Sequence, residues 1–217
     1  MNELFLGIDL GSSSVKVSIL DGASGQPVGS GQYPKNEMEI MAPAPGWAEQ
    51  NPENWWKNFL KAYWELVEKF QVNTGNISAI GITYQMHGLV VVDEEYHVLR
   101  PSIIWCDSRA VDLGSEAFRT IGEEKCLQEL LNSPGNFTAS KLGWVKKNEP
   151  KTFSKVHKFM LPGDYLALRL GGEITTTSTG LSEGTFWDFE SRTLSGTIMN
   201  YFGFSNEMVP EQVPSMG

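Results

Sequence analysis

Long apolar stretches, basic residues and cysteines are all scarce in this 217-residue sequence. No stretch reaches the roughly 18 apolar residues that a membrane-spanning helix needs, so we expect no membrane partner. The net charge of −9 argues against a broad surface for nucleic acid or anionic lipid. The two cysteines, Cys106 and Cys126, do not suggest a disulfide framework. Because the N-terminus also lacks the basic start of a secretion signal, we expect a cytoplasmic protein.

The residues that are present suit an ordinary globular core, with 41% hydrophobic and 20% charged side chains. The short apolar run 4–10 ends at Gly11 and predicts a buried strand. Two more strands, over 15–20 and 28–33, follow turns that are rich in glycine, so the chain is expected to open with hairpins.

A helix is predicted next, because Asn51 can cap its first turn, Pro52 suits that turn and aromatic and aliphatic residues recur at helical spacing up to Phe70. We expect it to end near residues 73–75. Further predicted elements are strands over 77–84 and 89–92 and an extended stretch over 98–105, in which Pro101 marks an edge or a bend. They are followed by mainly helix over 109–165, strand and turn over 174–189 and a short helix over 195–202, while 38–51 and 209–217 are expected to be loops.

This order of elements predicts an α/β domain with a mixed sheet flanked by helices. It lacks the regular alternation of strand and helix that a dinucleotide-binding fold of the doubly wound type requires. The length of 217 residues suits one domain, or one large domain with insertions, and we see no internal repeat.

The first motif is the run Gly7-Ile8-Asp9-Leu10-Gly11-Ser12-Ser13-Ser14-Val15-Lys16. A tight turn of glycine and serine presents backbone N–H groups and hydroxyls to an anion, and Lys16 can add positive charge. Asp9 would repel a bare phosphate, so its presence makes sense if Mg²⁺ lies between them, through water. A plain hairpin with a solvated aspartate fits the same residues, and the motif alone leaves both interpretations open.

Two later motifs carry groups that suit a polyol. In Gln85-Met86-His87-Gly88, His87 can exchange hydrogen bonds with a hydroxyl and Met86 offers an apolar wall, although a single histidine in a turn is more often without function. In Trp105-Cys106-Asp107-Ser108-Arg109, an aromatic face lies beside two charged groups. The alternative for the last motif is an Asp107–Arg109 pair that caps the following helix.

Taken together and in this order, these motifs resemble the FGGY family of carbohydrate kinases, and in particular its members that phosphorylate xylulose. Three more segments carry the resemblance, which extends over nearly the whole chain from about Leu4. They are Gly46-Trp47-Ala48-Glu49-Gln50-Asn51-Pro52-Glu53-Asn54-Trp55-Trp56, Phe137-Thr138-Ala139-Ser140-Lys141-Leu142-Gly143-Trp144-Val145 and Leu161-Pro162-Gly163-Asp164-Tyr165-Leu166. Asn136 departs from the small or aromatic residue usual at its position in the family.

The resemblance implies an RNase H-like, actin-type ATPase domain and ATP-dependent phosphorylation of a ketopentose, D-xylulose, to D-xylulose 5-phosphate. The implied partners are the sugar, ATP and Mg²⁺, and a homodimer is possible for the whole protein. Asp9 would organise Mg-ATP as the catalytic and, through water, metal-binding residue. The implied phosphate-binding residues are Gly11, Ser12, Ser13 and Lys16, and the implied sugar-binding residues are Met86, His87, Trp105, Asp107 and Arg109.

The catalytic base of such kinases is an aspartate in a Gly-rich segment that opens a second domain. None of the seven aspartates here has that setting. We therefore expect residues 1–217 to be the family's N-terminal, sugar-binding half, without the C-terminal domain and inactive alone. The alternatives are a kinase for ribulose, gluconate, fuculose or glycerol, a sugar-binding module without catalysis, and an unrelated actin-like ATPase. The loops 85–88 and 105–109, which suit a sugar, argue against the last of these.

Overall fold

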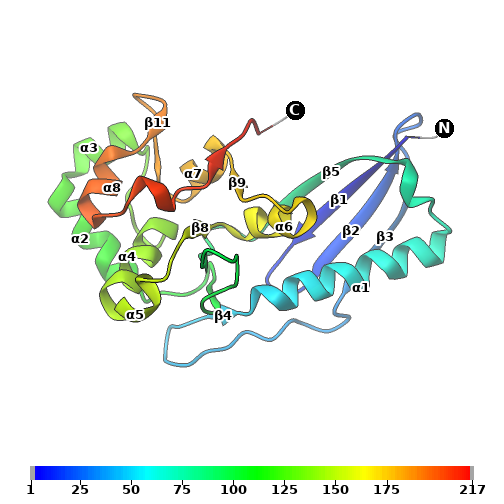
Figure 1. Cartoon of the computed structure of the whole chain (residues 1–217), viewed down its shortest axis with the longest axis horizontal. Coiled ribbons are helices and arrows are strands. Elements are labelled where there is room, and N and C mark those ends of the chain that lie inside the picture. Colours follow the sequence, from blue (N-terminus) through cyan, green and yellow to red (C-terminus); the bar gives the residue numbers. More distant parts are fainter. Residues whose placement is uncertain (1–2, 216–217) are drawn as a thin grey trace. The chain divides into compact units, whose positions relative to one another are not determined.

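The computed structural model describes residues 3–215 and divides the chain into two compact units. The first unit consists of Met1–Ile40 and Asn51–Gln85, and the second of Met41–Gln50 and Met86–Gly217. Each unit is therefore built from two separate stretches of sequence. Both combine helices with strands, as the predicted mixed α/β class requires (Figure 1).

A four-stranded sheet forms the centre of the first unit, in the order β3-β2-β1-β5 (Figure 1). Neighbours β1, β2 and β3 run antiparallel, which confirms the predicted hairpins, and β5 runs parallel to β1. The strands are β1 (Leu4–Leu10), β2 (Val15–Asp21), β3 (Pro27–Tyr33) and β5 (Ile77–Tyr84).

Helix α1 (Pro52–Phe70) lies along one face of this sheet, against β2 and β3 (Figure 1). As predicted, the Asn51 side chain caps the helix by accepting the Glu53 N–H at 2.9 Å. The helix ends at Phe70, slightly before the predicted 73–75, because Gln71 adopts a left-handed conformation with φ of 52°. A short 3-10 helix, η1 (Thr74–Asn76), then leads into β5.

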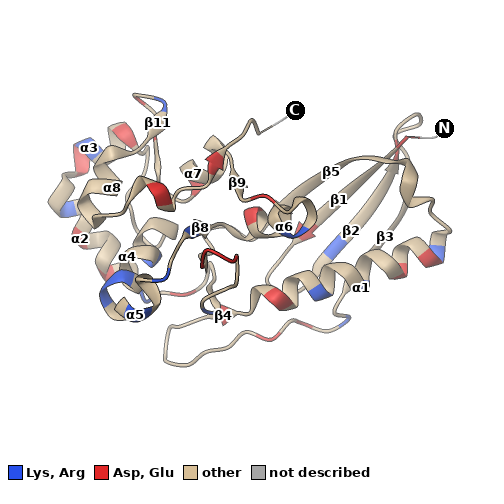
Figure 2. Cartoon of the chain, in the orientation of Figure 1, with Lys and Arg blue, Asp and Glu red and all other residues tan. Residues whose placement is uncertain are grey.

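The core of the first unit follows from strand periodicity. Every second residue of β1 and β2 is buried on the α1 side, where it meets the apolar stripe of the helix. The charged residues of α1 face away from this contact, and Figure 2 shows both signs along the helix. The buried residues are Leu4, Leu6, Ile8, Leu10, Val15, Val17 and Ile19 from the strands and Trp55, Phe59, Ala62 and Leu66 from α1.

The second unit contains short strand pairs among helices. Strand β4 (Glu49–Gln50) pairs with β7 (Ser102–Ile103), β6 (Val90–Val92) with β8 (Lys158–Met160), β9 (Thr175–Thr176) with β12 (Glu211–Gln212), and β10 (Trp187–Asp188) with β11 (Thr193–Leu194). The helices are α2 (Val111–Ile121), α3 (Glu123–Glu129), α4 (Thr138–Asn148), α5 (Pro150–Phe153), α6 (Pro162–Gly171), α7 (Ser178–Glu183), α8 (Gly196–Phe202) and the 3-10 helix η2 (Asn206–Met208).

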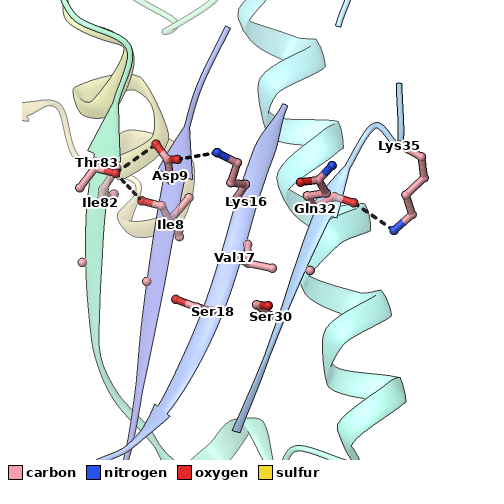
Figure 3. Close-up of a pocket in the computed structure, with 13 residues that line it drawn as sticks. Ile8, Asp9, Lys16, Val17, Ser18, Ser30, Gln32, Lys35, Ile82 and Thr83 are labelled. Carbon is pink, nitrogen blue, oxygen red and sulfur yellow. Dashed lines mark hydrogen bonds and ion pairs between the residues drawn. The ribbon is translucent and has the colours of Figure 1, made fainter. Parts of the chain in front are cut away.

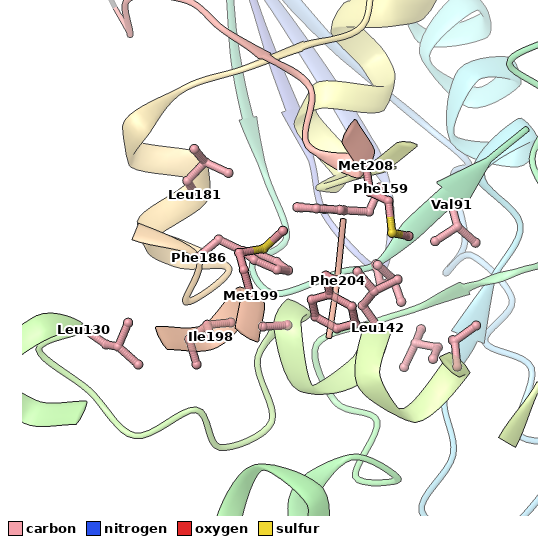
Figure 4. Packing of buried hydrophobic residues seen from close by; sticks show 14 of the residues in the cluster. Val91, Leu130, Leu142, Phe159, Leu181, Phe186, Ile198, Met199, Phe204 and Met208 are labelled. Atoms are coloured by element: carbon pink, nitrogen blue, oxygen red, sulfur yellow. The ribbon is translucent and has the colours of Figure 1, made fainter. Parts of the chain in front are cut away.

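Aromatic residues make up the centre of the core in this unit (Figure 4). The rings of Phe159 and Phe186 stack with their centroids 4.3 Å apart, and the centroid of the Phe204 ring lies 6.2 Å from that of Phe186. Leu142 of α4 and Met199 of α8 close the cluster. These contacts anchor α4, whose first residues lie beside the loops described below.

Three predictions for this unit were wrong in detail. Residues 158–160 lie in a stretch predicted to be mainly helical but form β8, because they pair with β6. Residues 178–183 were predicted as strand and turn but form α7, whose N-terminus is capped by Thr177 accepting the Gly180 N–H at 3.0 Å. The stretch 98–105, predicted to be extended, forms β7 at Ser102–Ile103 but is already a turn at Trp105. The short helix predicted over 195–202 is confirmed as α8, with Ser195 as its cap.

Asp164 gives the fold a testable dependence on pH. Its Oδ2 accepts from the Leu161 N–H at 3.1 Å and the Thr176 hydroxyl at 3.0 Å, and burial raises its pKa to about 7. An acid with a raised pKa in the folded state favours folding when protonated, so stability falls as pH rises from about 4 to about 7. We expect Asp164→Asn, which keeps an acceptor oxygen, to flatten this fall. Melting temperatures of both proteins between pH 5 and 8 test it, and an unchanged slope would contradict it.

None of the helices in residues 3–215 is long and apolar enough to cross a membrane.

Candidate functional site

A groove of about 900 Å³ crosses the face of the first unit's sheet that is turned away from α1 (Figure 3). Small residues line the floor of the groove. They are Gly7, Ser18, Ser30 and Gly81, one from each of the four adjacent strands. Asp9, Lys16 and Thr83 lie further along the same strands, with Gln32 and Lys35 toward the β3 edge. The sheet therefore offers an open, polar concavity with a carboxylate and two ammonium groups on it.

Asp9 is held at the groove by strand register. It pairs with Lys16 on β2 and Thr83 on β5, and its carboxylate accepts from the Thr83 hydroxyl at 3.2 Å. Lys16 Nζ is 3.5 Å away, and the side chains of Lys16 and Asp9 are 59% and 49% exposed. An ion pair at this exposure contributes little stability, so both charges remain able to turn toward a ligand. The arrangement suits an oxygen-liganded cation beside an anion.

The turn after β1 is built around Gly11. Its N–H donates to the Ser14 carbonyl at 3.1 Å, and a Cβ there would come within 3.2 Å of that carbonyl oxygen. The Ser13 carbonyl accepts from the Met38 N–H at 2.7 Å, while the Ser13 residue is exposed. The N–H of Gly11 is thus used by the turn itself, and the hydroxyls of Ser12 and Ser13 are the better candidates for phosphate contact. These residues fit Mg²⁺ and a phosphate by donor type.

The boundary between the units falls inside the second motif, after Gln85. Met86, the first residue on the other side, is 54% exposed. His87 has a φ of 58°, which is uncommon for a residue other than glycine. Its N–H donates to Glu183 Oε1 at 2.8 Å, its carbonyl accepts from Lys141 Nζ at 2.7 Å, and its ring meets Phe137 edge-on at 4.3 Å. The peptide is therefore fixed on both sides.

Electrostatics keep the imidazole of His87 neutral near pH 7. Burial lowers its pKa, and the nearby charge of Lys141 lowers it further. Lys141 is itself fully buried, and burial lowers its pKa to about 8. A neutral imidazole can donate through one ring nitrogen and accept through the other, which suits a hydroxyl ligand.

The third motif splits into exposed and buried residues. Trp105 is 48% exposed and Cys106 is exposed as well. Asp107 and Arg109 instead face the interior, with side chains 0% and 1% exposed, and pair at 2.7 Å. The predicted cap of the following helix is not formed, because Ala110 occupies the N-cap of α2 without a side-chain hydrogen bond.

The stretch Gly46–Glu49 supplies the other partners of this buried pair. The Asp107 carboxylate accepts from the Ala48 N–H at 2.6 Å, and Arg109 Nη1 lies 2.7 Å from Glu49 Oε1. The Arg109 guanidinium also stacks on the Trp47 ring at 3.9 Å. Asp107 and Arg109 therefore belong to a buried, ion-paired network that supports the 105–109 loop from the protein interior.

Three residues contact His87 although no role was predicted for them from the sequence, namely Phe137, Lys141 and Glu183. One signal for Lys141 was present, because it lies in the segment 137–145 that carries the family resemblance. Nothing local marked Glu183, which lies 96 residues from its partner.

Another cluster of possible metal ligands lies on the acidic turn after β6, coloured red in Figure 2. Asp93, Glu95 and His97 each offer a ligand atom within 4.8 Å of the others. Asp93 Oδ1 accepts from the N–H groups of Glu95 and His97 at 3.2 and 2.8 Å, so the turn accounts for this arrangement.

Comparison with known proteins identifies relatives along nearly the whole chain. A sequence profile described as the FGGY family of carbohydrate kinases, N-terminal domain, matches residues 4–216. Xylulose kinase of Escherichia coli K12 is 34% identical over 208 residues, which is 95% of this chain and 41% of that protein. The chain thus spans about two fifths of the length of such a curated relative.

Solved structures extend this likeness to the fold. A structure from Brucella ovis described as a xyloylose kinase matches with a TM-score of 0.89 and 33% identity, over 97% of this chain and 43% of that one. A gluconate kinase from Lactobacillus acidophilus matches with a TM-score of 0.87 at 21% identity, over 98% and 42%. The second match shows the fold alone.

Proposed function

Because the chain belongs to the FGGY family of carbohydrate kinases, we propose that the full-length protein transfers the γ-phosphoryl group of ATP to a hydroxyl of D-xylulose. The product would be D-xylulose 5-phosphate. The observation that supports this sugar is the extent of similarity to xylulose kinase, 34% identity over 95% of the chain. The activity belongs to the whole protein, since the chain spans 41% of that relative.

In this proposal the groove of the first unit serves the nucleotide. Asp9 would hold Mg²⁺ through water, and bound Mg²⁺ neutralises charge on the phosphates during transfer. Lys16 and the hydroxyls of Ser12 and Ser13 would contact phosphate oxygens. Asp9 is suited to this role because its carboxylate is half exposed. One carboxylate oxygen accepts from the neutral Thr83 hydroxyl, and the other makes a weak, exposed pair with Lys16.

The loops of the second unit would bind the sugar. Met86 and Trp105 offer exposed apolar surface for the C–H groups of the sugar, and His87 offers a neutral imidazole for its hydroxyls. Asp107 and Arg109 would shape the loop without touching the sugar, because their charged groups are occupied by each other, Ala48 and Glu49. The base that accepts the sugar proton is assigned to a residue outside this sequence.

A panel of sugars tests the proposal. ADP formation by the full-length gene product is measured with D-xylulose, ribulose, gluconate, fuculose and glycerol. We expect the highest kcat/KM with D-xylulose, and negligible turnover by the 217-residue chain alone. Equal or faster turnover of another sugar would overturn the choice of D-xylulose, and no turnover of any sugar would overturn the kinase assignment.

His87→Asn should weaken sugar binding selectively. Asparagine tolerates the left-handed backbone found here, so the loop is retained while the imidazole is lost. We expect the KM for the sugar to rise about tenfold, equivalent to about 1.4 kcal/mol, with an unchanged KM for ATP. His97→Asn, on the exposed acidic turn, is the matched control and should match wild type. An unchanged sugar KM in the His87 variant would exclude His87 from sugar contact.

A further inference from the structure

The His87 peptide is held in a strained conformation by two buried or half-buried charges of opposite sign. Its N–H donates to the Glu183 carboxylate at 2.8 Å and its carbonyl accepts from the Lys141 ammonium at 2.7 Å. A φ of 58° is unfavourable for an L-residue other than glycine, because Cβ comes too close to the following carbonyl oxygen. Such strain persists only when the surroundings over-determine it, and here two charge-assisted hydrogen bonds do so.

Lys141 joins the loop that contains His87 (residues 86–89) to the loop that begins at Trp105 (residues 105–108). Its ammonium also donates to the Ile104 carbonyl at 3.0 Å, immediately before the exposed Trp105. Two other side chains that flank the start of α4 contact the same two loops. Thr138 Oγ1 donates to the Gly88 carbonyl at 3.4 Å, and Asn136 Nδ2 donates to the Asp107 carbonyl. The segment 136–141 thus ties four carbonyls of both loops to one helix.

The hydrogen-bond partners of Lys141 indicate that this residue positions the two loops. Burying an ammonium group is costly, and within residues 3–215 the Lys141 ammonium donates to two backbone carbonyls, those of His87 and Ile104. An apolar side chain at this place in the core would avoid that cost, yet it could not fix two loops relative to each other. The gain from Lys141 is therefore placement of the loops.

We propose that Lys141 and Glu183 are positioning residues that clamp the His87 peptide and, through Ile104, set the Trp105 loop for sugar binding. The binding part of this proposal rests on the proposed function. The clamp orients groups that would contact sugar and touches no reacting atom. Its loss should therefore raise the KM for the sugar with little effect on the KM for ATP.

Lys146 provides a matched control on the same helix. Its ammonium also donates to two backbone carbonyls, those of Phe202 at 2.8 Å and Gly203 at 2.5 Å. These carbonyls lie at the end of α8, away in sequence from both candidate loops. Lys146→Met thus removes the same kind of contact from α4 without changing the clamp.

The experiment combines kinetics with amide hydrogen exchange in the full-length protein, for Lys141→Met, Glu183→Met and Lys146→Met. We expect Lys141→Met to raise the sugar KM at least tenfold, to change kcat less than threefold, and to speed exchange of the amides of residues 86–89 and 105–108 at least tenfold. Glu183→Met should speed exchange at 86–89 and raise the sugar KM. Lys146→Met should leave the sugar KM and both loops as in wild type.

The outcomes separate the clamp from the proposed function. If wild type phosphorylates no sugar, the function fails, and exchange still decides whether the loops depend on Lys141. A folded Lys141→Met protein with wild-type exchange in both loops overturns the clamp. Faster exchange together with an unchanged sugar KM would overturn its role in binding. If Lys141→Met does not fold, Glu183→Met decides by the same two readouts at residues 86–89.

Discussion

Asp9→Asn should lower kcat for sugar phosphorylation at least about 100-fold in the full-length protein, equivalent to about 2.7 kcal/mol of barrier. The amide keeps the size of the side chain and an oxygen that accepts from the Thr83 hydroxyl, so strand register is retained. It loses the negative charge that would hold a hydrated Mg²⁺ beside the phosphates in the proposed site. Initial rates at saturating ATP and sugar measure the effect, and a melting curve shows that the sheet is intact.

Asp21→Asn is the matched control for this change. Asp21 ends β2, and its carboxylate accepts from the N–H and the hydroxyl of Ser24 at 2.8 Å in an exposed turn. It does not line the groove that contains Asp9. Its kcat should remain near that of wild type. A kcat for Asp9→Asn above one third of the wild-type value, in a folded protein, would remove Asp9 from the proposed nucleotide site.

The first unit could be predicted closely from the sequence because its signals are local. Alternating burial in β1 and β2 follows from the period of a strand, and Asn51-Pro52 marks the first turn of α1. Asp9 could be placed near Lys16 for the same reason, since a short turn joins their strands. The groove itself required the position of β5, which lies far along the sequence and brings Thr83 to Asp9.

The second unit was harder to predict because its short elements depend on distant partners. Strand β8 forms only where β6 is available to pair with it, so helical propensity alone gave the wrong element. The surroundings of His87 show the same limit. Lys141 and Glu183 lie 54 and 96 residues away in sequence, and no local pattern relates either to that histidine.

The Trp105–Arg109 motif shows how neighbouring residues can take different roles. The sequence suggested one cluster of sugar-binding groups, but Trp105 is exposed while Asp107 and Arg109 are buried. The separation arises because residues 46–49, some 60 positions earlier, place a carboxylate, a backbone N–H and an indole around the buried pair. This arrangement makes stability, and not sugar affinity, the property that Arg109 should control.

We expect Arg109→Met to lower the free energy of unfolding by about 3–5 kcal/mol, the range found when one partner of a buried ion pair is removed. Methionine occupies part of the space beside Trp47 but leaves the Asp107 carboxylate without its guanidinium partner. Glu49 also loses Arg109, although it keeps Arg100 at 2.5 Å. Urea unfolding at pH 7 measures the change, which in a chain of this size corresponds to about 6–20 °C in Tm.

Arg119→Met on α2 controls for the loss of an arginine. Arg119 is exposed, and its Nε donates to the Ser115 carbonyl only at 3.4 Å, so the change should cost less than about 0.5 kcal/mol. The sugar KM, measured in the full-length protein, decides between the two roles considered for Arg109. Suppose that the free energy of unfolding of Arg109→Met lies within about 1 kcal/mol of the wild-type value while its sugar KM is tenfold higher. The guanidinium then contacts the sugar. If stability falls and the remaining folded protein keeps its sugar KM, Arg109 supports the loop from inside, because a ligand contact would be lost whatever the stability.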